Sequence, residues 1–168
     1  MKKCFATMVI CLTISLLFTG CQSQKAEQKE APQMTQIGNP WSNRSTVEEA
    51  EEKVAFSFGL AEVIDERYTV ERIRTMNSEL IEVVYRYEED EVCVRKKKGE
   101  GEDISGDFNQ YETCAEESRN GGTVTRYFSS EDHAIKLVIS YQGYSWSLVA
   151  SNGYQEGSEE AFLNQILK

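Results

Sequence analysis

The sequence feature that most constrains the fold is HAIKLVISYQGYSWSLVA, residues 133–150, in which apolar and polar residues alternate. Period-two alternation places every second side chain on the same face of a β-strand. Gln142 and Gly143 stand between two such runs and fit a two-residue hairpin loop, in which glycine supplies a positive φ. The register set by this loop brings three pairs onto one face: Tyr141 with Tyr144, Ile139 with Trp146, and Leu137 with Leu148. We therefore expect an antiparallel hairpin with one apolar face.

Four earlier segments have the composition or alternation of strands, which makes about six strands in all. They are ERYTVERIRTM, LIEVVYRY, EVCVRKK and GGTVTRYF, at 66–76, 80–87, 91–97 and 121–128. In the third segment, Val92 and Val94 share one side of the strand, and Cys93 is expected on the opposite, polar side.

A helix is expected on each side of these strands. In STVEEAEEKVAF (45–56), Ser45 and Glu48 match a capping box, and in SEEAFLNQILK (158–168), Ser158 is the expected N-cap. Each helix has an apolar face, made by Val47, Ala50 and Val54 in the first and by Phe162, Leu163, Ile166 and Leu167 in the second. The expected fold class is therefore α+β, an antiparallel meander sheet of about six strands with the N- and C-terminal helices packed on one face.

The N-terminus has the pattern of a lipoprotein leader. After MKK, the 14 residues from Phe5 to Phe18 are apolar and uncharged. As a helix they would span about 21 Å, too short for a hydrocarbon core of about 30 Å, so they are typical of a signal peptide. LFTGC (17–21) resembles the lipobox of bacterial lipoproteins, although Phe18 stands where leucine is usual. The alternative is an ordinary secreted protein cleaved at another site. We expect residues 1–20 to be removed, Cys21 to carry acyl chains such as palmitate, and the protein to sit on the extracytoplasmic face of a bacterial membrane.

Two further regions follow the leader. Residues 21–38 are polar and lack periodicity, which predicts a flexible tether, and residues 39–168 are long enough for a single globular domain.

Loss of Lys2 and Lys3 leaves 16 basic and 28 acidic residues, a net charge of 16 − 28 = −12. This charge argues against a nucleic-acid partner. It is consistent with binding of a basic partner, with binding of cations, or with a role in solubility alone. We expect a monomer that reaches the membrane through the lipid on Cys21.

The mature chain keeps few of the five cysteines for other roles. Cys4 and Cys11 leave with the leader, and Cys21 is the lipidation residue. Cys93 and Cys114 remain, in a compartment that permits oxidation. They form either a disulfide, which would stabilise the fold by roughly 3 kcal/mol, or two separate thiols.

The segment EDISGDFNQY, residues 102–111, has the most conspicuous spacing of polar side chains. Oxygen-bearing residues occupy every second position: Asp103, Ser105, Asp107 and Asn109. This imitates the start of a calcium-binding loop, with Asp103, Asp107 and Asn109 as candidate metal ligands. However, Phe108 replaces the glycine of the sharp turn, and Cys114 replaces the closing glutamate. The alternative is a glycine-rich turn in which the aspartates accept backbone N–H groups and Ile104, Phe108 and Tyr111 pack on the sheet.

The sequence contains no recognisable catalytic frame. His133 is the single histidine, it follows Asp132 in an expected turn, and no serine-nucleophile motif accompanies it. The basic run RKKK, 95–98, suits either an anion site or a solvated strand end paired with neighbouring acids, and we favour the second interpretation. No catalytic residue and no cofactor other than calcium is therefore suggested.

The order of these motifs resembles the domain-of-unknown-function 4367 family over about residues 39–168. NPW, STVEEAEEKVAFSF, RKKKGEGEDISGDFNQY, GGTVT, LVISYQGYSWSL and the helix after Ser158 carry the resemblance. It implies a small extracytoplasmic domain of the kind found on lipoproteins and single-span membrane proteins, some with anti-sigma-factor-like heads. It supplies no catalytic residues, and the pair of Cys93 and Cys114 is not part of the family pattern.

These observations lead to three hypotheses about function. The first is a lipid-anchored, non-catalytic domain that binds a protein partner or an envelope component, with a role in envelope sensing or signalling. The second is a hydrolase that acts on envelope material, which would need a pocket of convergent carboxylates or of His133. The third is a calcium-stabilised module.

Overall fold

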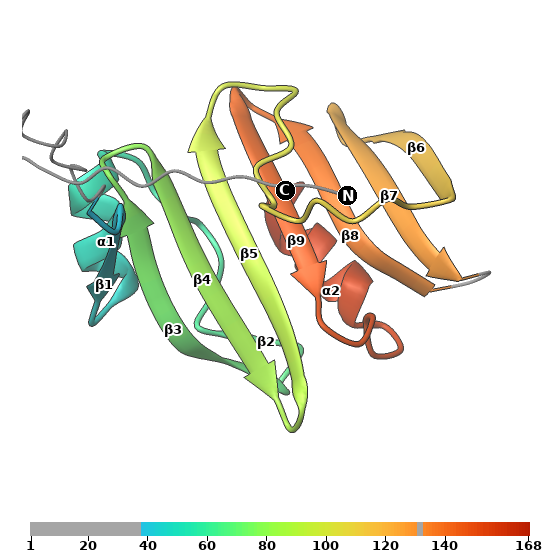
Figure 1. The fold of residues 1–168 in the computed structure, drawn as a ribbon, viewed down its shortest axis with the longest axis horizontal. Helices are drawn as coiled ribbons and strands as arrows, with labels where there is room; N and C mark the ends of the chain where they lie inside the picture. The colour runs from blue at the N-terminus through green and yellow to red at the C-terminus, as the bar shows by residue number, and fades with distance from the viewer. Residues whose placement is uncertain (1–37, 131–132) are drawn as a thin grey trace, which may run out of the picture. The chain divides into compact units, whose positions relative to one another are not determined.

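The computed structural model describes residues 38–130 and 133–168, which form one nine-stranded antiparallel sheet and two α-helices (Figure 1). The strands are β1 (Trp41–Arg44), β2 (Val63–Ile64), β3 (Tyr68–Met76), β4 (Leu80–Tyr87), β5 (Asp90–Lys98), β6 (Thr113–Arg119), β7 (Gly122–Ser130), β8 (His133–Tyr141) and β9 (Tyr144–Ala150). The helices are α1 (Val47–Val54) and α2 (Ser158–Ile166). The α+β class is confirmed, but the expected number of about six strands is too low.

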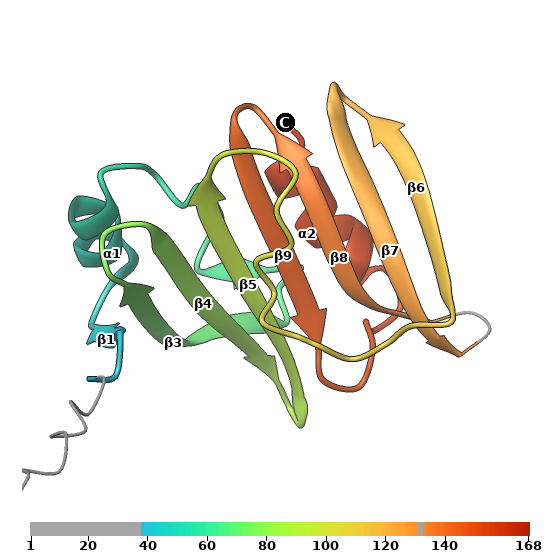
Figure 2. The ribbon, with the colours of Figure 1, turned by 45° about the horizontal axis from the view of Figure 1, so that its top comes forward.

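The sheet consists of two meanders rather than one. Its strand order is β1-β3-β4-β5-β9-β8-β7-β6, with β2 paired to β3 outside this path. The chain therefore builds β3 to β5, crosses to the far edge at β6, and returns strand by strand until β9 pairs with β5 (Figure 2). The crossing segment is residues 99–112.

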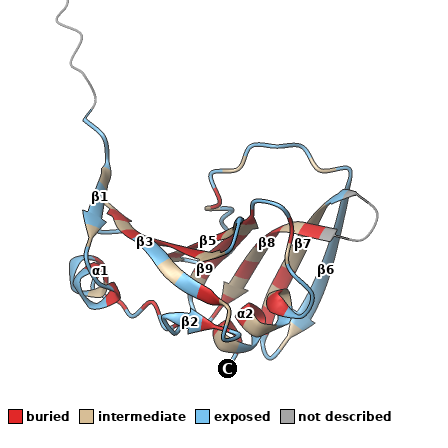
Figure 3. Cartoon of the chain, turned by 90° about the horizontal axis from the view of Figure 1, so that it is seen from below, coloured by how far each residue is buried: buried red, intermediate tan, exposed pale blue. Residues whose placement is uncertain are grey.

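The three strands that the sequence did not predict lack an apolar face of their own. β1 has four residues and β2 has two. β6 reads TCAEESR and is exposed along almost its whole length, because it is an edge strand that neither described helix covers (Figure 3). Strand prediction from alternation depends on one buried face, so these strands carry no such signal.

The C-terminal hairpin has the predicted register. Tyr141 pairs with Tyr144, and the pairs of Ile139 with Trp146 and Leu137 with Leu148 follow. Gln142 and Gly143 have φ values of 50° and 82°, the left-handed conformation at both loop positions of a tight hairpin.

Both helices begin one residue away from the expected cap. The N-cap of α1 is Thr46 rather than Ser45, and its hydroxyl accepts from Glu49 N–H at 3.2 Å. The Glu49 carboxylate in turn accepts from Ser45 N–H at 2.9 Å. Glu49 therefore takes the role in the capping box that the sequence predicts for Glu48. The N-cap of α2 is Gly157, and Ser158 is the first helical residue, whose hydroxyl donates to the Gln155 carbonyl.

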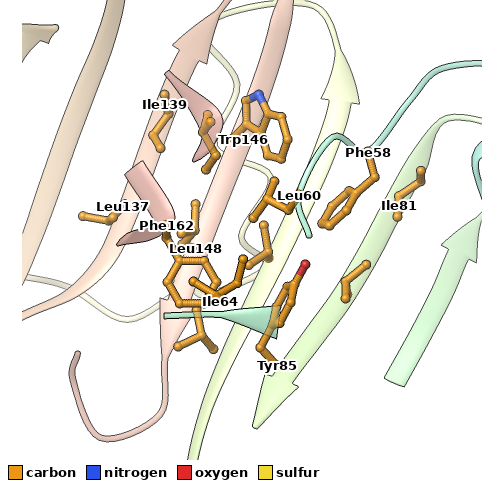
Figure 4. Packing of buried hydrophobic residues seen from close by; sticks show 14 of the residues in the cluster. Phe58, Leu60, Ile64, Ile81, Tyr85, Leu137, Ile139, Trp146, Leu148 and Phe162 are labelled. Carbon is orange, nitrogen blue, oxygen red and sulfur yellow. The ribbon is translucent and has the colours of Figure 1, made fainter. Parts of the chain in front are cut away.

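The two helices cover the same face of the sheet, as predicted, and the core lies between them and the strands (Figure 3). The predicted apolar faces of both helices are buried. At the centre, the Phe162 ring of α2 meets the Tyr85 ring of β4, with centroids 5.4 Å apart (Figure 4). Neither of the two described helices covers the opposite face of the sheet, called the helix-free face here, and the crossing segment lies on it. None of the described helices is long and apolar enough to cross a membrane.

Candidate functional site

The segment 99–112, which connects β5 to β6 and is called the strap here, crosses the helix-free face over β9, β8 and β7 (Figures 1 and 2). Two serine hydroxyls of the sheet hold its first half. Ser140 Oγ on β8 accepts from Gly101 N–H at 2.9 Å, and Ser145 Oγ on β9 accepts from Glu102 N–H at 3.1 Å. The strap is thus attached to the middle of the sheet, on the face opposite the core.

Within the strap, the first three of the four alternating oxygen-bearing side chains each accept a backbone N–H from two residues further along. Asp103 Oδ1 accepts from Ser105 at 2.9 Å, Ser105 Oγ from Asp107 at 3.1 Å, and Asp107 Oδ1 from Asn109 at 3.0 Å. Three consecutive side-chain turns of this kind fix the backbone without regular secondary structure. The prediction that the two aspartates accept backbone hydrogen bonds is confirmed.

The remaining oxygen of each aspartate also has a protein partner. Asp103 Oδ2 accepts from Lys136 Nζ at 2.9 Å, and Asp107 Oδ2 accepts from the Tyr111 hydroxyl. Among residues 38–130 and 133–168, no group of three or more His, Cys, Asp or Glu side chains is placed to hold a metal ion. Calcium ligation by Asp103, Asp107 and Asn109 therefore stays a prediction, and the geometry described here gives it no support.

Lys136 is the main link between the strap and the sheet. Its side chain is only 5% exposed, and its ammonium lies 4.3 Å from the ring centroid of Tyr127 and 5.0 Å from that of Tyr111. Burial raises the pKa of the Asp103 carboxyl, but hydrogen bonds from Ser105 and Lys136 outweigh this effect and the net pKa is lowered. Asp103 is consequently held as a carboxylate that pairs with the buried ammonium.

A second link runs through a buried carboxylate. Glu82 on β4 is fully buried and accepts from Arg74 Nε at 2.5 Å and from Arg95 Nε at 2.9 Å. Arg95 also donates to the carbonyl groups of Ile104 and Ser105 in the strap. This grouping ties β3, β4, β5 and the strap together through charge-assisted hydrogen bonds.

Gly106 and Trp41 complete this grouping. A Cβ atom at Gly106, which has φ +64°, would collide with the Arg95 guanidinium, so this position requires glycine. The ring centroid of Trp41 on β1 lies 4.2 Å from the guanidinium carbon of Arg74. An aromatic face at this distance stabilises a cation.

A hollow of about 760 Å³ lies beneath the second half of the strap. Its lining includes apolar side chains of the sheet, such as Ile135 and Val149, and polar side chains of the strap, such as Asn109 and Gln110. Two carboxylates contribute to it, Asp107 and Glu112, and the first of these is bound to Tyr111.

Cys93 lies in this hollow, and Cys114 lies on β6 with an exposed thiol; both are free in this structure. Burial raises the pKa of the Cys93 thiol to about 12, with a smaller contribution from the charge of Glu82. The register places the two cysteines in one row, Cys93–Val149–Lys136–Tyr127–Cys114, four strand spacings apart. At about 4.8 Å per spacing along the sheet this is roughly 19 Å, far beyond disulfide distance. Of the two alternatives that the sequence leaves open, this structure has two separate thiols, because β6 lies at the far edge of the sheet.

Phe108 is the most exposed large apolar side chain of the described residues, at 94%. The expectation that Phe108 packs on the sheet is therefore wrong. Tyr111 does pack as expected, with its ring centroid 5.6 Å from that of Tyr127. Phe108 borders a mainly apolar groove of about 310 Å³ whose walls include Trp41, Met76, Leu80 and Ile104. A fixed strap therefore presents an unpaired aromatic ring beside an apolar recess.

The basic run 95–98 divides between the two faces of the sheet. Arg95 and Lys97 pair with acids, Glu82 and Glu102, as expected for a strand end. Lys96 points the other way and is buried among aromatic rings, which the sequence interpretation missed. The sequence did contain a signal for this burial, because period-two alternation places position 96 on the same apolar face as Val92 and Val94.

Two other residues singled out in the sequence, Cys21 and the His133 side chain, lie outside what the structure describes. Cys21 lies outside the described residues, and so does the adjoining leader. His133 begins β8, but its side chain is not among those described.

Comparison with known proteins places the chain in no established group: no family model, no curated protein and no solved structure matches it. The resemblance to the domain-of-unknown-function 4367 family thus stays an expectation from the sequence motifs.

Proposed function

We propose that this protein is a lipid-anchored, extracytoplasmic, non-catalytic domain that binds a protein partner through the strap. The observation that carries the proposal is the Phe108 side chain, 94% exposed at the outer side of a strap whose backbone is held by its own side chains. Together with the apolar groove that it borders, the Phe108 ring forms a contiguous exposed apolar patch, and such patches are typical of interaction sites.

The strap is suited to binding because its conformation is already restricted. The side-chain turns at Asp103, Ser105 and Asp107 and the ion pair to Lys136 remove much of the conformational freedom that a loop would otherwise lose on binding. Preorganisation of this kind improves affinity by reducing the entropy cost of association. Aromatic side chains are also the residues most often found to dominate binding energy.

The charge of the strap indicates the chemistry of the partner. Residues 99–112 contain five acidic residues and no lysine or arginine: Glu100, Glu102, Asp103, Asp107 and Glu112. Asp103 and Glu102 pair with Lys136 and Lys97, which leaves Glu100, Asp107 and Glu112 without a lysine or arginine partner among the described residues. This acidic excess fits a partner with a basic surface and an apolar recess that takes Phe108. Complementary charge would speed the encounter, and the effect would weaken with added salt.

The anchor belongs to the same proposal. Acylation of Cys21 and a tether over 21–38 would hold the domain within roughly 20–25 Å of the membrane surface, by the dimensions of a flexible chain. A binding domain held there would meet partners at the membrane or in the envelope, as the family resemblance also implies.

Site-specific cross-linking tests the binding surface. The photoreactive residue p-benzoylphenylalanine is placed at position 108 in the full-length protein in its own cells, and in a separate strain at position 116, an exposed site on β6. We expect a discrete adduct from position 108 and none from position 116. Excess wild-type protein should suppress the adduct in isolated membranes, whereas Phe108→Asp protein should not. The same adduct pattern at both positions, or equal competition by the variant, would contradict the proposal.

The anchor is tested separately by growth with an alkyne-bearing fatty acid. Wild-type protein should incorporate the label and sediment with membranes, and Cys21→Ser protein should do neither. Equal labelling of both proteins would refute lipidation at Cys21.

A further inference from the structure

Lys96 is buried although it lies in a basic run that is typical of a solvent-exposed strand end. It is the second residue of the basic run 95–98, yet its side chain points to the core face of β5 together with Val92 and Val94. Lys96 is only 8% exposed, whereas Lys98, two residues further on, is exposed at the end of the same strand.

The ammonium group of Lys96 has neutral partners. It donates to the carbonyl oxygen of Ser57 at 2.6 Å and to that of Phe58 at 3.4 Å. The ring centroids of Tyr144 and Trp146 lie 4.2 and 4.4 Å from the nitrogen, close enough for favourable cation–π contact.

The described residues form no ion pair with Lys96. The carboxylate whose charge it feels is that of Glu51 on α1, which accepts hydrogen bonds from Phe58 N–H at 2.6 Å and from the Ser57 hydroxyl at 2.9 Å. Burial accordingly lowers the pKa of Lys96 to about 8, and Glu51 offsets only part of this effect. The ammonium is therefore a buried charge without a bound counter-ion.

Lys96 lines a small pocket that has the size of a compact ligand. The pocket measures about 210 Å³, and its walls include Trp146, Tyr141, Gln142 and Gln165. Figure 4 shows the Phe58 and Trp146 rings side by side in this part of the core, with centroids 5.7 Å apart. The pocket therefore combines aromatic surface, two side-chain amides and one uncompensated cation.

We propose that this pocket binds a small monocarboxylate, with the carboxylate on the Lys96 ammonium and the apolar part against Trp146 and Tyr144. A carboxylate supplies the counter-charge that the ammonium lacks, and buried charges are stabilised mainly by such pairing. An apolar group of modest size fits the aromatic walls. The site lies on the face of the sheet opposite the strap, so it is independent of partner binding through Phe108.

The same chemistry has two sources, a free organic acid and the C-terminal carboxylate of a peptide. Phenylacetate represents the first, and a tripeptide ending in phenylalanine with a free C-terminus represents the second. Phenylacetamide and the C-terminally amidated tripeptide are their amide counterparts, which have nearly the same shape and lack the carboxylate charge.

The two tryptophans provide an internal control, because Trp146 lines the pocket and Trp41 lies on the helix-free face. Indole N–H resonances of full-length, detergent-solubilised protein are followed while each probe is added. We expect phenylacetate or the free tripeptide to shift the Trp146 resonance progressively and to leave that of Trp41 in place. The amide counterpart should bind about tenfold more weakly or not at all. If neither acid moves the Trp146 resonance, or if acid and amide act equally, the proposal is overturned.

Variants identify the anchoring group. Lys96→Met should lose at least about tenfold in affinity for the acid that binds, whereas Lys98→Met should bind like the wild type. The wild-type titration decides the proposal by itself if Lys96→Met does not fold. The responding probe distinguishes the source: a response to phenylacetate alone indicates a free acid, and a response to the free tripeptide alone indicates a peptide terminus.

Discussion

Glu82 on β4 and Arg95 on β5 are cross-strand partners on neighbouring strands, and Glu82 Oε2 accepts from Arg95 Nε at 2.9 Å. The carboxylate has no exposed surface, and the guanidinium continues outward to the carbonyl groups of the strap. One arginine therefore couples a buried acid to the proposed binding segment. Because removal of one partner from a buried pair leaves the other charge without compensation, this contact has clear mutational consequences.

Glu82→Gln should lower the free energy of unfolding by about 3 kcal/mol, since Arg74 and Arg95 would lose their shared counter-charge. Urea denaturation followed by circular dichroism measures the change. Glu116→Gln on the exposed strand β6 is the matched control and should stay within about 0.5 kcal/mol of wild type. If the two variants are equally stable, Glu82 does not hold the strands together in the manner inferred.

Glu82 should also contribute to acid sensitivity. Burial raises the pKa of its carboxyl, but the Arg74 hydrogen bond and the Arg95 charge outweigh burial, and the net pKa lies below the ordinary value of 4.5. A depressed folded-state pKa means that the contribution to stability is complete above about pH 4.5 and is lost as the pH falls through the lower value. Unfolding free energies of wild type and Glu82→Gln should therefore converge below pH 4.5. A constant difference between them down to pH 3 would contradict this assignment.

The ion pair between Asp103 and Lys136 should respond asymmetrically to mutation. The Lys136 side chain is 5% exposed and that of Asp103 is 40% exposed. Asp103→Asn leaves a buried ammonium unpaired and should cost about 2 kcal/mol, whereas Lys136→Met leaves a carboxylate that water can reach and should cost less. Thermal or urea unfolding of both variants gives the comparison, and hydrogen exchange at Ser105 N–H reports strap loosening. A larger loss for Lys136→Met would reverse the inferred roles.

Lys96 should make stability depend on pH in the alkaline range. Its folded-state pKa of about 8 lies below its ordinary value of 10.5, so the folded state releases the proton first. Between pH 8 and 10 the unfolded state binds more protons, and the lysine's contribution to stability rises with pH. The stability of Lys96→Met relative to wild type should therefore fall over this range. Lys98→Met should show no such trend, and a flat difference for Lys96→Met would argue against a depressed pKa.

The two cysteines of the domain should differ in reactivity. Cys114 is exposed on β6, whereas burial raises the pKa of Cys93 to about 12 and disfavours its thiolate. Iodoacetamide at pH 8 should modify Cys114 in folded protein and reach Cys93 only in denaturant, as peptide mass mapping would show. A non-reduced mass two hydrogens lower, with neither residue modified, would instead show that Cys93 and Cys114 form a disulfide.

Most of the local structure could be predicted from the sequence. The hairpin of 133–150 has the expected register because glycine at a two-residue loop and one apolar face permit only one pairing. Both helices follow from their apolar faces, although their caps are shifted by one residue. The hydrogen bonds of Asp103 and Asp107 to the strap backbone were predictable too, because they connect residues two positions apart.

The candidate site depended on contacts between residues far apart in the chain. Alternation assigns Glu82 and Arg95 to polar faces, but only the pairing of β4 with β5 and with β3 brings one carboxylate between two arginines. In the same way, Lys96 meets Tyr144 and Trp146 only because β5 pairs with β9.

The sequence by itself therefore determined both helices, six of the nine strands and which faces of these elements are apolar, because those properties depend on near neighbours along the chain. The tertiary structure alone decided that β6 lies at the far edge, that Cys93 and Cys114 are four strands apart, and that the strap leaves Phe108 in solvent. Strand order is a property of the whole sheet, since it is set by which arrangement buries the most apolar surface and satisfies the most backbone hydrogen bonds.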